Sequence, residues 1–227
     1  MLRPDARAGD FTGKLVGFEG EKLVLNDILA DPRGCVHAGT RHWGPEGMEK
    51  PGRLCLIDLG ASPRLVDDGI ELANGLGLSP DDRTLYFADS AARRIYAYDV
   101  DPAAGVLSRK RVFARIPAED GIPDGLTVGA EGFVWCALWC GGQVVRFDPA
   151  GKVERRIRLP ARQTSSLAFG GDDLRDLCVT SAAEPWRSDL APSGYRFDAG
   201  SDGGSLFRIR LEVQGKRGRR AVLRGGL

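Results

Sequence analysis

Four polar residues recur at matching places along the chain, and together they could hold a metal ion. Asn26, Asn74, Asp124 and Ser165 each lie at the start of a short strand-like segment, and successive members are 48, 50 and 41 residues apart. All four side chains carry oxygen, and one is a carboxylate. Such oxygens suit a hard divalent cation such as Ca²⁺ or Mg²⁺, provided that the fold brings them together. The alternative is that Asn, Asp and Ser are simply the residues that favour turns before strands.

The segments that carry these residues look like repeated groups of short strands. After Asn74, the pattern predicts strands near residues 85–89, 94–100 and 111–116, separated by turns rich in Pro, Asp and Gly. Four strands in each unit of about 40–50 residues are typical of a β-propeller blade. Because the innermost strand of every blade lines the central channel, we expect the four polar residues to converge there. Helical solenoids are disfavoured, since the strands alternate with period 2.

The composition and charge of the chain exclude several classes of function. The 227 residues are 42% hydrophobic and carry a formal net charge of +1, so no global field attracts nucleic acid or a membrane surface. No apolar run approaches the ~20 residues of a membrane span, and the first residues lack the apolar core of a signal peptide. Five cysteines without a C-x-x-C pair predict reduced, mostly buried thiols in a cytoplasmic protein. Two histidines make a His-rich metal site or a His-based triad hard to assemble.

An ordered series of motifs resembles the senescence marker protein/gluconolactonase family of six-bladed propellers, which includes regucalcin and bacterial sugar lactonases. Any single motif is weak, but their order at blade spacing is specific, and the resemblance covers roughly residues 23–209. The matching segments are Asn26-Asp27 with Asp31-Pro32-Arg33-Gly34, Ala73-Asn74-Gly75-Leu76, Ile122-Pro123-Asp124-Gly125-Leu126, Gly141-Gly142-Gln143-Val144-Val145, and Thr164-Ser165-Ser166 with Ala168-Phe169-Gly170-Gly171.

The resemblance implies a hydrolase of sugar lactones with a divalent metal at the channel mouth. It implies that Asn74 and Asp124 are metal ligands, that Asn26 faces the substrate, and that Ca²⁺ is the first candidate, with Zn²⁺, Mg²⁺ or Mn²⁺ as alternatives. An ester carbonyl needs a Lewis acid and an activated water, and Asp124 could ligate the metal and act as general base. Ser165 is predicted to contact the substrate. No G-x-S-x-G elbow supports a serine hydrolase.

Two departures from the family pattern matter. Val24 occupies the arginine position of the family's R-x-N-D motif, so one substrate contact is expected to be missing and the lactone to differ or to carry less negative charge. The strand with the family's metal-binding Glu is expected to lie before Met1.

We therefore predict one all-β domain of the six-bladed type with about four to five blades: a partial blade over residues 1–25, four repeats over 26–209, and a basic tail over 210–227.

Several alternatives stay open on the sequence. An incomplete ring would expose strand edges, which favours self-association, and the chain could be a non-catalytic binding scaffold instead of an enzyme. Residues 41–51 form either a plain surface loop or a substrate lid with His42, Trp43 and Glu46. A second insertion over residues 183–202 either lines the same opening or packs on the rim. The basic tail is expected to be a solvated or frayed terminus rather than to bind a polyanion. Trp135 and Trp139 are expected between blades, although Trp139 could reach the rim.

Overall fold

The structure, a computed structural model, describes residues 24–44, 46–58, 63–184, 190–196 and 202–221. These residues form antiparallel strands and one short 3-10 helix, η1 (Ala118–Asp120). The all-β prediction is therefore confirmed for the described part of the chain. The predicted partial blade falls almost wholly on residues 1–23, outside the described residues, and residues 185–189 and 197–201 of the second insertion lie outside them too.

Four sheets of three or four antiparallel strands follow one another along the chain. The first has the order β1 (Leu25–Ala30), β2 (Val36–Thr40), β5 (Gly52–Ile57), β6 (Arg64–Ile70). The second contains β7 (Ala73–Leu78), β8 (Thr84–Asp89), β9 (Arg94–Asp101) and β10 (Val106–Arg115). The third contains β11 (Ile122–Val128), β12 (Val134–Trp139), β13 (Gln143–Phe147) and β14 (Val153–Arg158). The fourth has three strands, β15 (Thr164–Gly170), β16 (Asp176–Ser181) and β17 (Leu206–Arg210).

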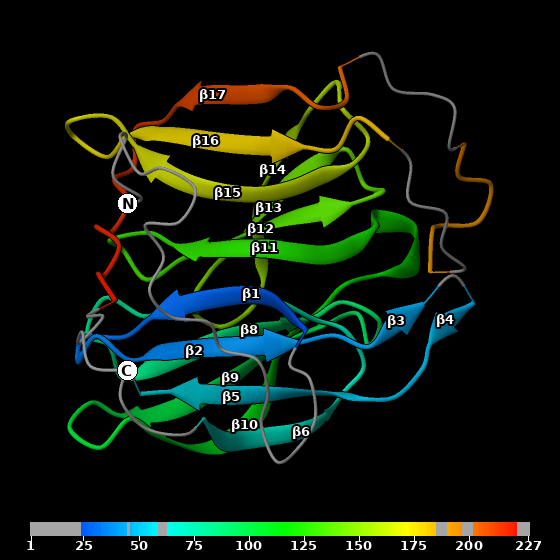
Figure 1. Ribbon diagram of the computed structural model, residues 1–227. Coiled ribbons are helices and arrows are strands. Elements are labelled where there is room, and N and C mark those ends of the chain that lie inside the picture. The colour runs from blue at the N-terminus through cyan, green and yellow to red at the C-terminus, as the bar shows by residue number, and fades with distance from the viewer. Residues whose placement is uncertain (1–23, 45, 59–62, 185–189, 197–201, 222–227) are drawn as a thin grey trace, which may run out of the picture.

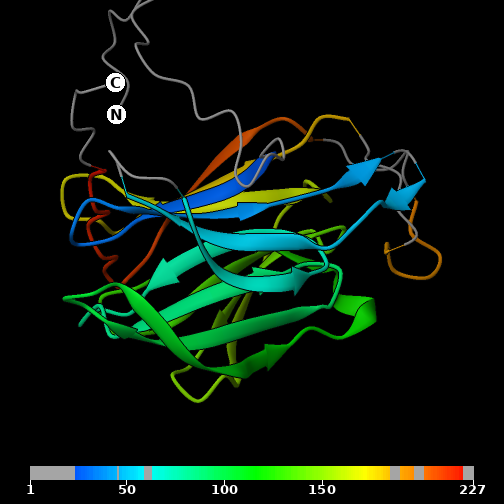
Figure 2. The ribbon, with the colours of Figure 1, turned by 60° about the horizontal axis from the view of Figure 1, so that its bottom comes forward.

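The sheets are arranged as four successive blades of a propeller (Figures 1 and 2). The first strand of each sheet packs against the first strand of the next: β1 contacts β7, β7 contacts β11, and β11 contacts β15. A small hairpin, β3 (Trp43–Gly44) with β4 (Gly47–Met48), projects from the first sheet between β2 and β5. The described residues thus contain four blades, and the six-bladed ring predicted from the resemblance is not shown.

The hydrophobic core lies between neighbouring blades. One buried cluster joins the second and third sheets through side chains such as Ile95, Leu126 and Phe147. Another joins the third and fourth sheets, where the fully buried ring of Trp135 meets Phe169 edge-on, with centroids 5.9 Å apart. Because each strand alternates its side chains between two faces, every inner blade contributes to two such clusters. The prediction that Trp135 packs between blades is confirmed.

The inner strands approach one another so closely that only glycine fits at two contact positions. A Cβ on Gly75 of β7 would lie 2.6 Å from the carbonyl oxygen of Asp124 and closer still to the backbone nitrogen of Leu126. A Cβ on Gly125 of β11 would lie 2.7 Å from Cα of Ser166 on β15. Glycine at these places lets adjacent blades meet backbone to backbone. Each glycine directly follows one of the repeated polar residues, so this packing also sets where those residues lie.

Part of the basic tail is tied to the propeller, although a solvated or frayed terminus was expected and residues 217–221 are exposed. Leu211 is buried, and Gly215 pairs with Gly129 in an isolated β-bridge. The Lys216 ammonium donates to the carbonyl oxygen of Ser79 at 2.6 Å and forms an ion pair with Asp82. Arg219 pairs with the same carboxylate. The ion pairs of Lys216 and Arg219 therefore connect the tail, which follows the fourth blade, to Asp82 in the second blade.

The cysteines follow the prediction from composition. None of the five cysteines is in a disulfide bond, and Cys178 is the one that is not fully buried. No helix among the described residues has the length and apolar character that a membrane crossing requires.

Candidate active site

The repeated polar residues lie at an equivalent irregularity in every blade. The pairing of each inner strand with its neighbour shifts register between Leu25 and Ile28, between Ala73 and Leu76, between Pro123 and Leu126, and between Thr164 and Ser166. These four shifts enclose Asn26, Asn74, Asp124 and Ser165 respectively. A β-bulge bends the strand and redirects a side chain, and bulges of this kind are common beside active sites. The repeat in the sequence is therefore a repeat of bulges on the inner strands.

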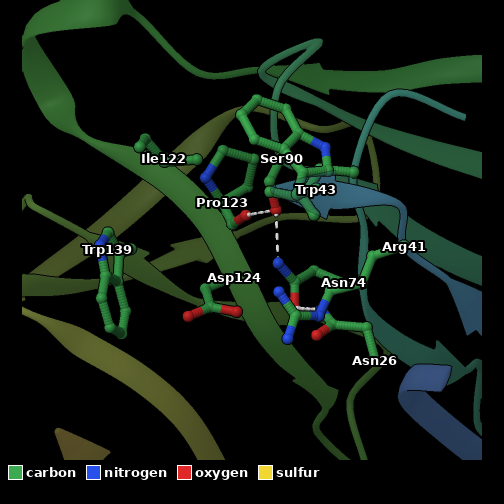
Figure 3. Close-up of a pocket in the computed structure, with 10 residues that line it drawn as sticks. Asn26, Arg41, Trp43, Asn74, Ser90, Ile122, Pro123, Asp124 and Trp139 are labelled. Carbon is green, nitrogen blue, oxygen red and sulfur yellow. Dashed lines mark hydrogen bonds between the residues drawn. The ribbon is translucent and has the colours of Figure 1, made fainter. Parts of the chain in front are cut away.

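A pocket of about 220 Å³ opens among the first three inner strands (Figure 3). Three of the predicted site residues, Asn26, Asn74 and Asp124, line it. The other lining residues, from strand ends and loops, are Arg41, Trp43, Leu72, Ser90, Ile122, Pro123 and Trp139. Since Asn26, Asn74 and Asp124 come from separate blades, the propeller arrangement brings together polar groups that are distant in the sequence.

A chain of hydrogen bonds holds one wall of the pocket. Nδ2 of Asn26 donates to Oδ1 of Asn74 at 2.8 Å and to the carbonyl oxygen of Ala73 at 2.8 Å. Nδ2 of Asn74 donates to the Ser90 hydroxyl at 2.7 Å, and that hydroxyl donates to the carbonyl oxygen of Pro123. The dashed lines of Figure 3 show the part of this chain that runs from Asn26 to Pro123. The network fixes the orientation of both amides before any ligand binds.

Asp124 is the anionic group of the pocket. Burial raises the pKa of Asp124 well above its usual range, the nearby carboxylate of Asp27 raises it further, and the backbone N–H of Gly125 opposes both. Burial also raises the pKa of Asp27. No cationic side chain of the described residues forms an ion pair with Asp124. A carboxylate with these surroundings binds a proton or a cation more readily than one in water.

Ser165 lies apart from the other three residues. Its hydroxyl is 2.8 Å from the hydroxyl of Thr180 on β16, and it does not line the pocket. The bulge is shared, but the fourth blade turns this residue toward its own second strand. A role for Ser165 in substrate binding stays a prediction.

Pocket residues outside the repeat position were not identified as a group from the sequence. Ser90 follows the end of β8, Arg41 follows the end of β2, and Trp139 ends β12. Trp43, named above as a candidate lid residue, does line the pocket, and its indole N–H donates to the carbonyl oxygen of Glu71 at 2.8 Å. The shared signal is position, because Ser90, Arg41 and Trp139 lie where a second strand ends near the channel mouth. Arg41 also forms a backbone hydrogen bond with Val24, the residue expected to leave the pocket without a guanidinium.

The residues present fit part of a divalent-cation site. Asp124 offers a carboxylate whose charge no described side-chain cation balances, and Oδ1 of Asn74 accepts one hydrogen bond and keeps a second lone pair. Within the described ranges, no cluster of three or more His, Cys, Asp or Glu side chains could hold a metal ion. Ca²⁺ takes six to eight oxygen ligands, so these two residues would supply a minority of them.

Comparison with known proteins identifies the family of the chain. Residues 4–183 match the family described as "SMP-30/Gluconolactonase/LRE-like region". The chain belongs to this family. Pentonolactonase XacC of Haloferax volcanii is 35% identical over 192 residues, which cover 85% of this chain and 64% of the relative.

Solved structures of SMP-30/gluconolactonase relatives have the same fold. A calcium-binding protein, regucalcin, from Agrobacterium tumefaciens superposes with a TM-score of 0.74 at 29% identity, over 88% of this chain and 65% of that one. A gluconolactonase from Xanthomonas campestris superposes with a TM-score of 0.63 at 25% identity, over 74% of this chain and 57% of that one. The chain thus spans about 64% of the length of curated relatives such as the pentonolactonase.

Proposed function

We propose that the protein hydrolyses sugar lactones with the help of a divalent cation. The observation that carries this proposal is the pocket in which Asp124, Asn74 and Asn26 meet from three blades. Relatives named as a pentonolactonase and a gluconolactonase support the substrate class. The name of the regucalcin relative, a calcium-binding protein, supports Ca²⁺ as the first cation to test, with Mg²⁺, Mn²⁺ and Zn²⁺ as alternatives.

Asp124 and Asn74 would hold the cation. When bound, a divalent cation supplies Lewis-acid stabilisation of the negative charge that develops on an ester carbonyl. Asn26 and Asn74 present amides, held by their mutual hydrogen bond, that orient the sugar hydroxyls. Trp43, Ile122 and Trp139 supply apolar wall for the carbon skeleton of the ring.

Asp124 also serves as general base in this proposal. Its carboxylate takes a proton from the attacking water as the water oxygen bonds to the carbonyl carbon. The ring C–O bond then breaks, and the proton passes from Asp124 to the ring oxygen, which leaves a hydroxy acid. Burial raises the pKa of Asp124 and so makes its carboxylate a stronger base than one in water, whereas a bound cation acts in the opposite direction.

An acid-release assay on a lactone panel, with each cation and with a chelator, tests the proposal. We expect chelation to stop turnover, and Asp124→Asn to lower it by about 10²–10⁴-fold, since that variant keeps the shape but removes the base. Asp172→Asn, which changes an exposed carboxylate outside the pocket, is the matched control and is expected to keep full turnover. Undiminished turnover in Asp124→Asn would refute the assignment.

The rival interpretation is a non-catalytic scaffold, and a thermal-shift titration separates the two. Binding of Ca²⁺ to the native state should raise the melting temperature of the wild-type protein but not that of Asp124→Asn. A chain that shows neither this shift nor turnover of any lactone would be a scaffold. A cytoplasmic location stays a prediction.

A further inference from the structure

The main chain of Arg41, at the edge of the pocket, is positioned by hydrogen bonds of its own backbone and of its neighbours. Its N–H donates to the carbonyl oxygen of Val24 at 3.0 Å, which extends the β1–β2 pairing by one residue. The preceding Thr40 is fully buried, and its hydroxyl accepts the N–H of Arg53 at 2.8 Å. Two residues later, Trp43 is anchored through its indole to Glu71. The Arg41 Cα is therefore positioned from both sides.

The guanidinium of Arg41 lines the pocket, and no counter-ion for it lies among the described residues. Neither an ion pair nor a side-chain hydrogen bond joins it to any other described residue. Other arginines of the same chain are engaged: Arg33 pairs with Asp31, and Arg146 pairs with both Glu131 and Glu154. An arginine that lines a cavity with its donors unused is available to a ligand.

The groups around Arg41 define what that ligand must carry. Figure 3 shows its side chain reaching into the pocket beside Asn26 and Asn74, on the wall that faces Asp124. The Asn26 amide donates both of its N–H groups, to Asn74 and Ala73, and the Asn74 amide donates one to Ser90, so the guanidinium is the cationic donor group of this wall. Its planar array of N–H groups matches the two oxygens of a carboxylate in a bidentate pair. A substrate that spans the pocket would therefore place an ester near Asp124 and a carboxylate near Arg41.

We infer that Arg41 is a specificity-determining residue that binds a free carboxylate of the substrate, so that the pocket prefers lactones of sugar diacids over neutral sugar lactones. This inference rests on the proposed lactone hydrolysis and names its substrate class. It also reverses the expectation drawn from Val24, because the positive charge is supplied from the end of β2 instead of from β1.

A matched substrate pair tests the inference directly. D-Glucono-1,4-lactone and D-glucaro-1,4-lactone share one ring and differ in a CH₂OH group against a carboxylate. We expect the wild-type protein to favour the second in kcat/KM by at least about tenfold, and Arg41→Gln to reduce that ratio by about 10–100-fold. Arg41→Lys should recover part of the preference, since it keeps the charge but not the planar donors. Arg115→Gln, at an exposed arginine outside the pocket, should leave the ratio unchanged.

A binding measurement keeps the test independent of turnover. If neither lactone is hydrolysed, the proposed function fails, and calorimetric titration with the two intact lactones then tests Arg41. Tighter binding of the glucarolactone that is lost in Arg41→Gln would support carboxylate recognition. Equal affinity for the two lactones, equal kcat/KM for them, or a stronger preference for a lactone that bears a phosphate would overturn the inference.

Discussion

Asp124 and His37 are both enclosed ionisable side chains, and their surroundings give them different roles. Asp124 faces a pocket with amides, a hydroxyl and a guanidinium on its walls. His37 on β2 has no exposed surface, and neither ring nitrogen has a hydrogen-bond partner in the described structure. Its Nε2 lies 3.9 Å from a carboxylate oxygen of Asp31, too far for a hydrogen bond. The first residue is a candidate for chemistry, and the second affects stability.

His37 should make stability depend on pH in the acidic range. Burial lowers its pKa from 6.5 to about 4, and the arginines Arg33 and Arg64 act in the same direction, whereas Asp31 opposes them. Between these two values the unfolded chain binds a proton that the folded chain does not, so the free energy of unfolding falls as pH falls from 6.5 toward 4. The histidine accounts for a loss of up to about 3 kcal/mol.

Urea unfolding at pH 7, 5.5 and 4 measures this dependence. His37→Leu should lose stability less steeply with acid than the wild type does. His42→Gln, a change at the only other histidine, should leave the slope as it is. A His37→Leu variant with the wild-type slope would contradict the assignment.

Among the strands, the inner strand of each blade positions the residues of the site. The bulge in β1, β7 and β11 aims one residue of each strand at the pocket, and the glycine after it in β7 and in β11 lets the next blade come close. Asn74 and Asp124 are therefore near each other because Gly75 contacts the backbone of β11. Geometry at the pocket and packing between blades depend on the same short segments.

Gly75→Ala should separate the two proposed ligands. The added methyl group would overlap the backbone of β11, so the strands must move apart, at a cost of about 1–3 kcal/mol of stability. A displacement of about 1 Å at a catalytic group lowers the rate by about 100-fold, which the lactone assay would detect. Gly170→Ala on β15 is the control, because its Cβ would meet Cys178 Sγ at an ordinary 3.5 Å. Full activity of Gly75→Ala would show that the contact between these strands does not position the site.

At the scale of the whole molecule, the first and last blades differ from the two between them. β1 exposes Ile28 at 57%, and β17 exposes Leu206 at 68%. The fourth sheet has three described strands, so the outer edge of β17 has no partner strand in the described part of the chain. Apolar side chains beside an unpaired strand edge favour association with another chain. Self-association through these edges, predicted from the sequence, stays a proposal.

Sedimentation velocity across a concentration series tests this proposal. We expect the wild-type chain to sediment as a mixture of monomer and larger species, and the double variant Ile28→Lys, Leu206→Lys to associate at least about tenfold more weakly. Val106→Lys removes a comparably exposed apolar residue, 46% exposed, from the outer strand of the second blade and serves as control. A monomeric wild-type chain at all concentrations would exclude association through these edges.

The strand period, the four blade-like repeats and the repeated polar position could be predicted from the amino-acid sequence, because alternation, turn residues and repeat spacing are local properties. From them the pocket residues Asn26, Asn74 and Asp124 could be predicted. The absence of Ser165 from the pocket lining could not be predicted, since its orientation depends on a hydrogen bond to Thr180 on the neighbouring strand of its own blade. The tail was expected to be solvated or frayed because chain termini commonly are. Its ion pair between Lys216 and Asp82 joins residues more than a hundred positions apart, which no local pattern reveals.

Which side chains join the repeated residues at the pocket depends on how the blades pack together. Arg41, Ser90 and Trp139 follow or end second strands, and nothing in their local sequence distinguishes them from other polar or aromatic residues near turns. They meet because the blades pack around one axis and their strand ends converge at one mouth. The burial of His37 arises in the same way, from the neighbours that a blade receives when the sheets come together.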